Sequence, residues 1–341
     1  MLLKFGFCLP IFACPGARLF RAPAYPSLNA ATTMRLGRLA DQLGYHSLWV
    51  ADHLMLGQDE AILEGWTTLC ALAGMTARAQ LGVIHYNHAF RHPALTAKMA
   101  ATLDQISGGR YIHFIDYGNQ PREFLAYGLH PDDAVEERIA QMVEGLELTL
   151  KLWSAREPVT FAGRYYAVAG AVCRPTPVQQ PHPPIWIGEA HPMLLDAAAR
   201  YADAWNSVPV GLEALRQRLA ELRAACARVG RDYDAIEKTY EVQILIASDR
   251  DELRRKLDAM LALIPPGERP ADVVAFARGE AAEPPAWMRE TWLIGAPDEI
   301  EAQIRRFAEL GVTHFMLWFA DAPDESGMRL FAERMLGKSG A

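Results

Sequence analysis

The chain has 341 residues, of which 51% are hydrophobic and 22% charged, values that exclude a collagen-like or intrinsically disordered protein. Its length fits either one large α/β barrel or two average domains. The 34 Lys and Arg residues against 41 Asp and Glu residues give a formal net charge of −7, without a basic run of five. This balance argues against a nucleic-acid partner.

The five cysteines are scattered without a C-x-x-C pair, which argues against a disulfide framework and a zinc knuckle. We expect reduced thiols in a cytoplasmic protein. The apolar part of residues 1–10 is too short for a secretory signal. No run of about 18 apolar residues occurs, so no membrane partner is expected.

Short apolar runs of strand length alternate with longer stretches of helical period, which is typical of repeated β-α units around a parallel sheet. The predicted strands are 3–9, 46–51, 80–85, 111–116, 184–188, 203–207, 236–247 and 313–319. Eight such strands favour a closed (β/α)8 barrel, a TIM barrel of the α/β class, as a single domain over 1–341. A doubly wound open sheet is the alternative. The chain contains neither G-x-G-x-x-G nor G-x-x-x-x-G-K-[ST], which disfavours a dinucleotide or a P-loop triphosphate.

Helix signals lie between the strands. Apolar residues in 134–153 recur at three, four and seven, which predicts one amphipathic helix. Pro297 followed by two acids predicts another helix start, and Ser248 is a candidate N-cap. Glycines that follow helical stretches and precede strands indicate left-handed helix ends; these are Gly44, Gly108, Gly109, Gly230 and Gly311.

Three stretches are too irregular to be simple barrel connections: 10–28, 154–183 and 264–288. Arg164-Tyr165-Tyr166 and the prolines after it predict a hairpin followed by an extended run in the second stretch. Insertions of this length often act as lids or interface elements. The second and third stretches are therefore candidate lids, with a dimer contact as the alternative.

In a barrel of this kind the site lies at the carboxyl ends of the strands. Five histidines lie at or near these ends: His53, His85, His88, His92 and His113. A metal site is one reading, but no pair has the H-E-x-x-H spacing, and we expect no metal. Asp52 next to His53 is more informative, because a carboxylate and an imidazole at a barrel mouth can manage a proton near neutral pH. Adjacent strand residues point to opposite sides, so the two need not touch.

Alternation along the strands also suggests which side chains face the cavity. The candidates for substrate contact are Phe7, His113, Asp116 and Trp318. A carboxylate such as Asp116 that ends an apolar strand costs several kcal/mol if it is buried unpaired, so we expect it to be solvated, paired with His113 or used in the chemistry.

Several strings together resemble the bacterial luciferase-like flavin-dependent oxidoreductases. They occur in family order and comprise 40–54, 91–93, 98–110, 121–124, 184–188, 198–205 and 311–314. The resemblance implies a (β/α)8 barrel with insertions, usually homodimeric, that holds FMN or the related deazaflavin. In the monooxygenase branch, reduced FMN from a separate reductase meets O2 to give a C4a-(hydro)peroxyflavin that oxidises the substrate. In the deazaflavin branch a hydride moves between substrate and cofactor without oxygen.

The resemblance also implies roles for particular residues. His53 matches a histidine beside the flavin that acts as base or proton donor. His85 and Asn87 match the end of strand three, which lines the flavin ring and contains an unusual backbone turn. Tyr117, followed by Gly118, stands near the place where some relatives use an arginine for the flavin phosphate.

The turn after strand five departs from the family pattern. Many relatives have a Gly/Ser-rich turn there that holds the phosphate at a helix start, whereas this chain has Gly188, Glu189, Ala190 and His191. The N–H groups of Ala190 and His191 can still serve as donors. A carboxylate about 4 Å from a phosphate repels it by roughly 4 kcal/mol at an effective dielectric of about 20, so Glu189 must point away or pair with an arginine.

These observations lead us to expect a two-component FMN-dependent monooxygenase that acts on a small organic substrate, with His53 and Asp52 as catalytic residues. A deazaflavin-dependent hydride-transfer oxidoreductase is the alternative. A flavin-binding barrel without turnover is the third possibility, which the altered phosphate turn would permit. The sequence does not identify the substrate or the reductase.

Overall fold

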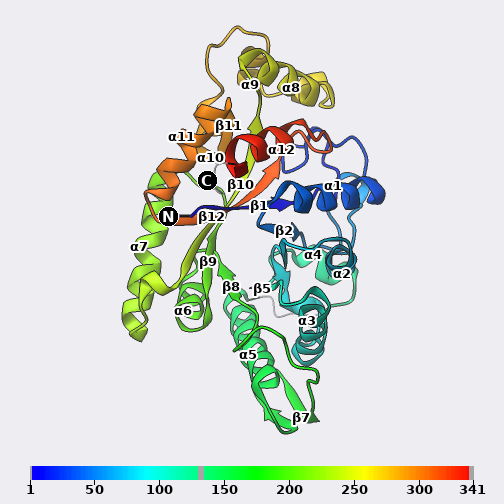
Figure 1. Ribbon diagram of the computed structural model, residues 1–341, viewed down its shortest axis with the longest axis vertical. Coiled ribbons are helices and arrows are strands. Elements are labelled where there is room, and N and C mark those ends of the chain that lie inside the picture. The colour runs from blue at the N-terminus through cyan, green and yellow to red at the C-terminus, as the bar shows by residue number, and fades with distance from the viewer. Residues whose placement is uncertain (1, 130–133, 338–341) are drawn as a thin grey trace.

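The computed structural model describes residues 2–129 and 134–337 (Figure 1). Eight parallel strands form a closed barrel, in which each strand pairs with the next and the last pairs with the first. They are β1 (Lys4–Cys8), β2 (Ser47–Val50), β3 (Gln80–Val83), β5 (Tyr111–Asp116), β8 (Ile185–Gly188), β9 (Ala204–Ser207), β10 (Glu237–Ile246) and β12 (Val312–Phe319). The predicted (β/α)8 barrel is confirmed, and each predicted strand overlaps one of the eight. The open-sheet alternative is excluded.

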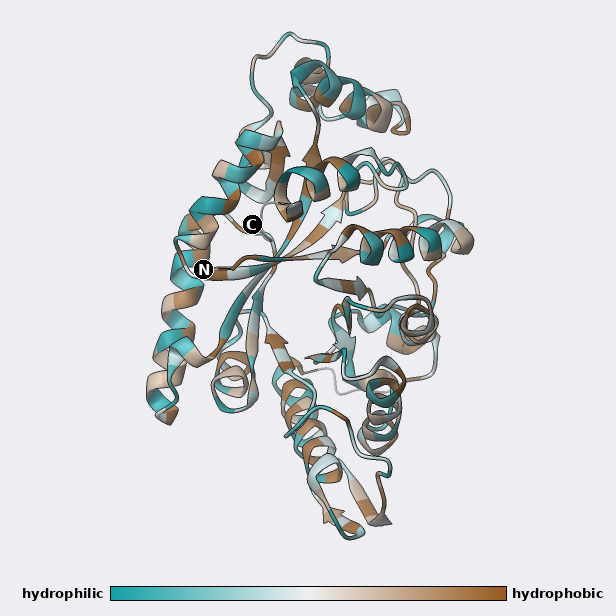
Figure 2. Ribbon diagram, viewed as in Figure 1, coloured by the Kyte–Doolittle hydropathy of each residue, from teal (hydrophilic) through white to brown (hydrophobic). Residues whose placement is uncertain are grey.

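Helices surround the barrel and cover its outer wall (Figure 1). They are α1 (Ala30–Leu43), α2 (Gly65–Met75), α3 (Pro93–Ser107), α4 (Pro121–Ala126), α5 (Val135–Ser154), α6 (Pro192–Tyr201), α7 (Leu212–Val229), α8 (Arg250–Ala262), α9 (Ala271–Ala277), α10 (Ala286–Thr291), α11 (Pro297–Ala308) and α12 (Ser326–Phe331). The helix predicted over 134–153 and the start at Pro297 are confirmed. Hydrophobic residues concentrate on the strands, and the helices carry mixed faces (Figure 2). Among the described residues, no helix is both long and apolar enough to cross a bilayer.

The helix ends follow the glycine signals. Gly44, Gly108 and Gly230 end α1, α3 and α7 with φ of 92°, 70° and 70°, a left-handed conformation that suits glycine. The predicted cap at Ser248 is wrong by one residue. Asp249 is the N-cap of α8 and accepts from the N–H of Glu252, while Ser248 binds the Glu252 carboxylate.

Four further strands lie outside the barrel ring. The predicted hairpin in 154–183 is confirmed as β6 (Val159–Ala162) and β7 (Ala167–Ala171). The short β4 (Tyr86–Asn87) pairs with β5, and β11 (Trp292–Gly295) pairs with the second half of β10. Neither β4 nor β11 was predicted from the sequence. β10 is therefore a shared strand, whose first half pairs with β9 and which continues past the barrel to β11.

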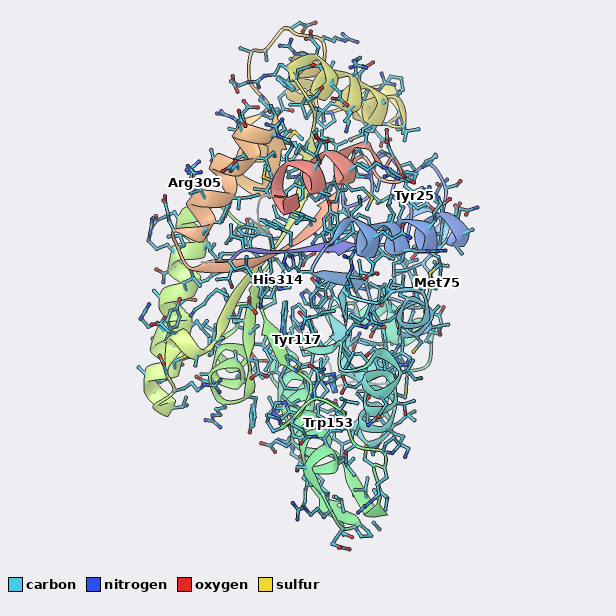
Figure 3. All side chains as sticks on the ribbon, viewed as in Figure 1. Tyr25, Met75, Tyr117, Trp153, Arg305 and His314 are labelled. Atoms are coloured by element: carbon cyan, nitrogen blue, oxygen red, sulfur yellow. The ribbon has the colours of Figure 1, made fainter. Side chains whose placement is uncertain are left out.

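Large side chains fill the middle of the barrel. The ring of Trp49 lies 4.9 Å from that of Trp186 and 6.0 Å from that of Phe114, measured between centroids. Ser47 accepts from Trp49 Nε1 at 2.8 Å and lies 2.7 Å from His314 Nε2; Figure 3 marks His314. Burial lowers the pKa of His314 well below its usual value, so this imidazole is neutral. The barrel is thus a packed core, and the space for chemistry lies at the carboxyl ends of the strands.

The three irregular stretches pack in two different places. Leu19 of 10–28 and Ile264 of 264–288 belong to a second hydrophobic cluster with α8, α9 and β11, at the top of Figure 1. The hairpin lies against α5 at the opposite end of the molecule, where Glu144 accepts from the N–H of Tyr165 and Tyr166. The extended run after it follows α3. The lid roles of these stretches stay predictions.

Gly6 and Gly82 face the barrel interior, and their lack of a side chain leaves space for the Trp49 ring. A Cβ on Gly82 would lie 2.1 Å from the Trp49 ring, and one on Gly6 would lie 2.2 Å from Ser47 Oγ. We expect Gly82→Ala to lower the free energy of unfolding by about 1–3 kcal/mol through overpacking, as measured by urea denaturation. Gly74→Ala in α2 is the control: nothing lies within 4 Å of its Cβ, so it should be neutral or slightly stabilising. Equal effects of the two substitutions would contradict this account of the barrel interior.

Candidate active site

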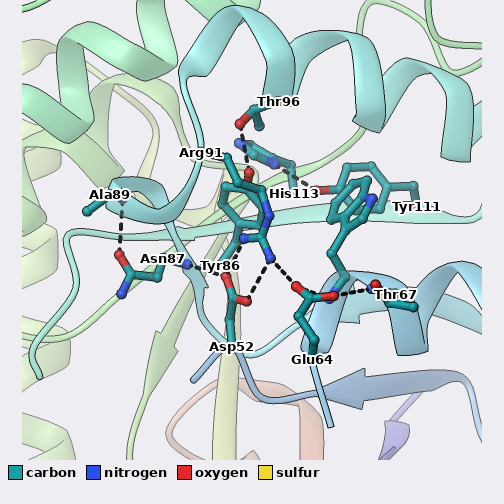
Figure 4. Close-up of polar contacts among 11 residues, drawn as sticks. Asp52, Glu64, Thr67, Tyr86, Asn87, Ala89, Arg91, Thr96, Tyr111 and His113 are labelled. Atoms are coloured by element: carbon teal, nitrogen blue, oxygen red, sulfur yellow. Dashed lines mark hydrogen bonds and ion pairs between the residues drawn. The ribbon is translucent and has the colours of Figure 1, made fainter. Parts of the chain in front are cut away.

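Asp52 and His53 leave β2 on opposite sides of the chain, as the alternation of a strand predicts. The carboxylate of Asp52 is buried outside the barrel and accepts from the N–H of Asn87 at 2.9 Å. Arg91 forms a two-pronged ion pair with it, at 2.9 and 3.2 Å (Figure 4). Arg91 also contacts Glu64, and its guanidinium lies 5.0 Å from the centre of the Tyr86 ring.

This network fixes the backbone after β3. Burial raises the pKa of Asp52, and the Arg91 charge opposes that rise. The Asp52 carboxylate makes its hydrogen bonds and its ion pair between the barrel strands and the surrounding helices. It therefore positions the loop that carries Asn87. Its predicted catalytic role has no support in this geometry, because it does not face the barrel interior.

His53 has a carboxylate partner that the sequence analysis did not assign. Its Nδ1 lies 3.0 Å from Oε1 of Glu123, and the N–H of Met55 donates to the same oxygen. The His53 side chain is 25% exposed and that of Glu123 only 4%. Glu123 lies in the first turn of α4, so the helix N-terminus favours its negative charge. The buried carboxylate holds a proton on Nδ1 and leaves Nε2 of His53 available for chemistry.

His85 projects into the interior after a cis peptide bond between Ile84 and His85. Its ring lies edge-on to Phe114, with centroids 4.4 Å apart. Nδ1 is 3.6 Å from Oδ2 of Asp116, and Nε2 is 3.9 Å from Oε2 of Glu241. His85 and Asp116 thus meet in the mouth, whereas Asp116 and His113 do not pair. Within the described residues, no group of three or more His, Cys, Asp or Glu side chains has the arrangement of a metal site.

The exits of β3 and β5 pack against each other. Oδ1 of Asn87 accepts from the N–H of Ala89, and a Cβ on Gly118 (φ 78°) would lie 2.6 Å from that oxygen. Next to them, the Tyr117 ring lies 5.6 Å from the guanidinium of Arg138, whose Nε donates to Gly118 O. Arg138 belongs to α5, so a guanidinium reaches this exit from a helix about 20 residues further along the chain.

The turn after β8 has an unusual backbone. Glu189 adopts φ of 71°, and its carbonyl accepts from Trp205 Nε1 at 3.0 Å. Its carboxylate lies 4.0 Å from Arg218, in agreement with the expectation that it pairs with an arginine. Burial raises the pKa of Glu189, and the nearby His85 opposes the rise. Gly188, Ala190 and His191 complete the turn, and His191 caps α6 by accepting from the N–H of Met193.

Two of the four candidate substrate contacts lie on the wrong face of the barrel wall. Phe7 packs outward, 5.8 Å from both Tyr45 and Phe319 between ring centroids. His113 also faces outward, with Nδ1 2.8 Å from the Tyr111 hydroxyl (Figure 4). Trp153 of α5 lies beside it. Burial lowers the pKa of His113 to about 3, so its imidazole is neutral.

Asp116 and Trp318 face inward, as predicted. Trp318 Nε1 donates to Oε1 of Glu241 at 2.6 Å, and that carboxylate also pairs with Arg21 at 2.6 Å. The sequence analysis did not identify Glu241 or Arg21. Glu241 lies in the middle of β10, where polar residues at alternate positions, Thr239, Glu241 and Gln243, are the signal that could have revealed it.

Comparison with known proteins gives the family. A sequence model described as a luciferase-like monooxygenase matches residues 10–314, and the chain belongs to this family. The phthiodiolone/phenolphthiodiolone dimycocerosates ketoreductase of Mycobacterium tuberculosis H37Rv is 28% identical, over 92% of this chain and 91% of that protein.

Solved structures agree on the fold. Monooxygenase RslO1 from Streptomyces bottropensis is 26% identical, with a TM-score of 0.76 over 98% of this chain and 99% of that chain. An F420-dependent secondary alcohol dehydrogenase, solved with an F420-acetone adduct, has the same TM-score and coverage at 21% identity. The related structures thus include both monooxygenases and deazaflavin-dependent enzymes. The chain is a barrel of this oxidoreductase family.

The Arg91 ion pair predicts a pH-dependent stability defect. Removing the guanidinium by Arg91→Met leaves Asp52 buried and unpaired, which should cost about 3–5 kcal/mol of unfolding free energy near pH 8. The folded-state pKa of Asp52, already raised above 3.8, then rises further, so the folded protein holds the proton more tightly than the unfolded chain. The stabilisation that comes from protonating Asp52 is therefore present at low pH, and it is lost as the pH rises through the pKa of Asp52 in the folded variant.

Guanidinium denaturation at pH 5 and pH 8 checks this prediction, with a smaller defect expected at pH 5. The control is Arg122→Met, which breaks the exposed pair with Glu60 and should cost less than about 1 kcal/mol at both values. A defect of the same size at both pH values for Arg91→Met would show that Asp52 is not the source.

Proposed function

We propose that this protein is an oxidoreductase that interconverts a ketone and a secondary alcohol with a flavin-type cofactor, preferably a deazaflavin. The observation that carries this proposal is the pair formed by His53 and Glu123. A buried carboxylate that orients a partly exposed imidazole makes a proton donor and acceptor, which carbonyl reduction requires. The ketoreductase relative, matched over nearly the whole chain, supports the same chemistry.

The proton and the hydride have separate sources in this scheme. When bound, the cofactor supplies or accepts the hydride. In the direction of reduction, Nε2 of His53 would give a proton to the carbonyl oxygen. Glu123 accepts from Nδ1–H and keeps the imidazole oriented for this transfer. In the direction of oxidation, Nε2 takes the hydroxyl proton.

The polar residues at the carboxyl ends of the strands are suited to binding the polar edge of a flavin-type ring. Among the described residues, several buried atoms here lack a hydrogen-bond partner, including His85 Nε2, Glu241 Oε2, Glu123 Oε2 and Arg21 Nη1. Such atoms are costly unless a ligand pairs with them. The ring edge of a flavin or deazaflavin carries donors and acceptors that suit them. We propose that His85 and Asn87 contact the ring, and that Tyr117, Gly118 and the turn 188–191 hold its chain.

The second candidate is the FMN-dependent monooxygenase expected from the sequence. The identity of 26% to RslO1 over almost the full length favours it. This function requires O2 and a separate reductase that delivers reduced FMN. A homodimer is proposed for either candidate. A barrel without turnover is the weakest proposal, because a noncatalytic protein has no need of the His53–Glu123 pair.

An anaerobic assay distinguishes the two candidates. Reduced F420 or reduced FMN is mixed with the protein and a panel of ketones, and the return of the oxidised cofactor is followed by its visible absorbance. We expect ketone-dependent oxidation without O2. If the reduced cofactor is consumed only when O2 is admitted and an oxygenated product forms, the monooxygenase is correct. Failure of both cofactors to bind would remove both candidates.

The proton role predicts a separation of turnover from binding. His53→Ala should lower kcat by about 10²–10⁴-fold, and Glu123→Gln by about 10–100-fold, with cofactor affinity nearly unchanged. Steady-state kinetics and cofactor titrations give the two quantities. His182→Ala, a histidine outside the mouth that stacks on Trp153, is the control and should change neither. A normal kcat for His53→Ala across the pH range would refute this role.

A further inference from the structure

A second pair of polar groups lies inside the barrel, away from His53. Glu241 is at the middle of β10, which is separated from β2 around the barrel by β12 and β1. The residue is 2% exposed. Its Oε1 is fully engaged by Trp318 and Arg21. Its other oxygen, Oε2, is buried without a partner.

The free oxygen of Glu241 faces a free nitrogen of His85. Nε2 of His85 is 3.9 Å from Oε2 and also has no hydrogen-bond partner. This separation is too long for a direct hydrogen bond. One atom about 2.8 Å from each would bridge them, since two such contacts span up to about 5.6 Å.

The surroundings decide which kind of atom fits. Nδ1 of His85 lies 3.6 Å from Asp116, which is too long for a hydrogen bond, so this contact does not hold the ring proton on Nδ1. With the proton on Nε2, His85 can donate a hydrogen bond into the gap, while Oε2 of Glu241 accepts one. Glu189 adds a further carboxylate on the same side, while Arg21 is already paired with Glu241. A hydroxyl placed between these atoms can donate to Oε2 and accept from Nε2–H, whereas a carbonyl or an ionised carboxylate has no hydrogen to give to Oε2.

We propose that one hydroxyl of the ligand bridges the two residues, donating its hydrogen to Oε2 of Glu241 and accepting a hydrogen bond from Nε2 of His85. The inference rests on the proposed function and extends it, because it gives the site a second recognition point in addition to His53. The hydroxyl belongs either to the cofactor or to a substrate that carries a hydroxyl besides the reacting oxygen. Arg21 and Trp318 position Glu241 for this contact.

Binding measurements test the cofactor as the source. F420 and FMN are titrated into the wild-type protein, Glu241→Gln and the control Glu237→Gln, with tryptophan fluorescence as the readout. Glu237 lies on the same strand but at its other end, where it binds Lys4 and Thr313. If the hydroxyl is part of the cofactor, Glu241→Gln weakens affinity about tenfold or more, and Glu237→Gln leaves it within about twofold.

The substrate is tested with two alcohols that differ by one hydroxyl, cyclohexanol and trans-1,2-cyclohexanediol, titrated into the cofactor-loaded wild type and Glu241→Gln. If the hydroxyl is on the substrate, the wild type binds the diol about tenfold more tightly than the monool, and Glu241→Gln loses that preference. A crystal structure of the loaded wild type with the diol then shows a ligand oxygen within hydrogen-bond distance of both atoms, and requires no variant to fold.

The proposal is overturned if Glu241→Gln matches the wild type in both titrations, or if that crystal structure shows only water between the two residues. These readouts report binding, so they stand even if no ketone is reduced. A protein that binds the cofactor normally and reduces ketones, but shows no effect of Glu241→Gln, would contradict this inference alone. A protein that binds neither cofactor would contradict the proposed function as well.

Discussion

The ion pair between Asp52 and Arg91 is the constraint from which the geometry of the mouth follows. A carboxylate buried in the wall must be matched by charge and hydrogen bonds, and Arg91 and the N–H of Asn87 supply both. These contacts join the end of β2 to the loop after β3. They therefore fix the positions of two side chains. His53 points inward one residue after Asp52, and His85 lies in the loop that Asn87 anchors.

The barrel has two regions with different chemistry. Around Trp49, the interior is filled by aromatic rings, with His314 held neutral by burial. Above this layer the inward side chains become ionisable, with Asp116, Glu189 and Glu241 around His85. The packed layer provides the rigidity that holds these groups in place, and the polar layer has unpaired atoms that a ligand can satisfy.

The sequence predicted the fold well because its signals are local. Apolar runs and glycine stops are read within ten residues, and they placed all eight barrel strands. The site was harder, since its pairs are distant in sequence: Glu123 is 70 residues from His53, and the guanidinium beside Tyr117 belongs to Arg138 of α5. Phe7 shows another limit, because alternation gives the period of a strand but not which parity faces inward.

The length of β10 has a mechanical consequence for the outer cluster of α8, α9 and β11. Glu241 lies at the centre of this strand, and β11 pairs with its second half from Gln243 to Ile246. The cluster cannot move away from the barrel as a unit unless the hydrogen bonds between β10 and β11 break or β10 bends next to Glu241. A displacement of the outer cluster would therefore be passed along β10 to Glu241 at the site.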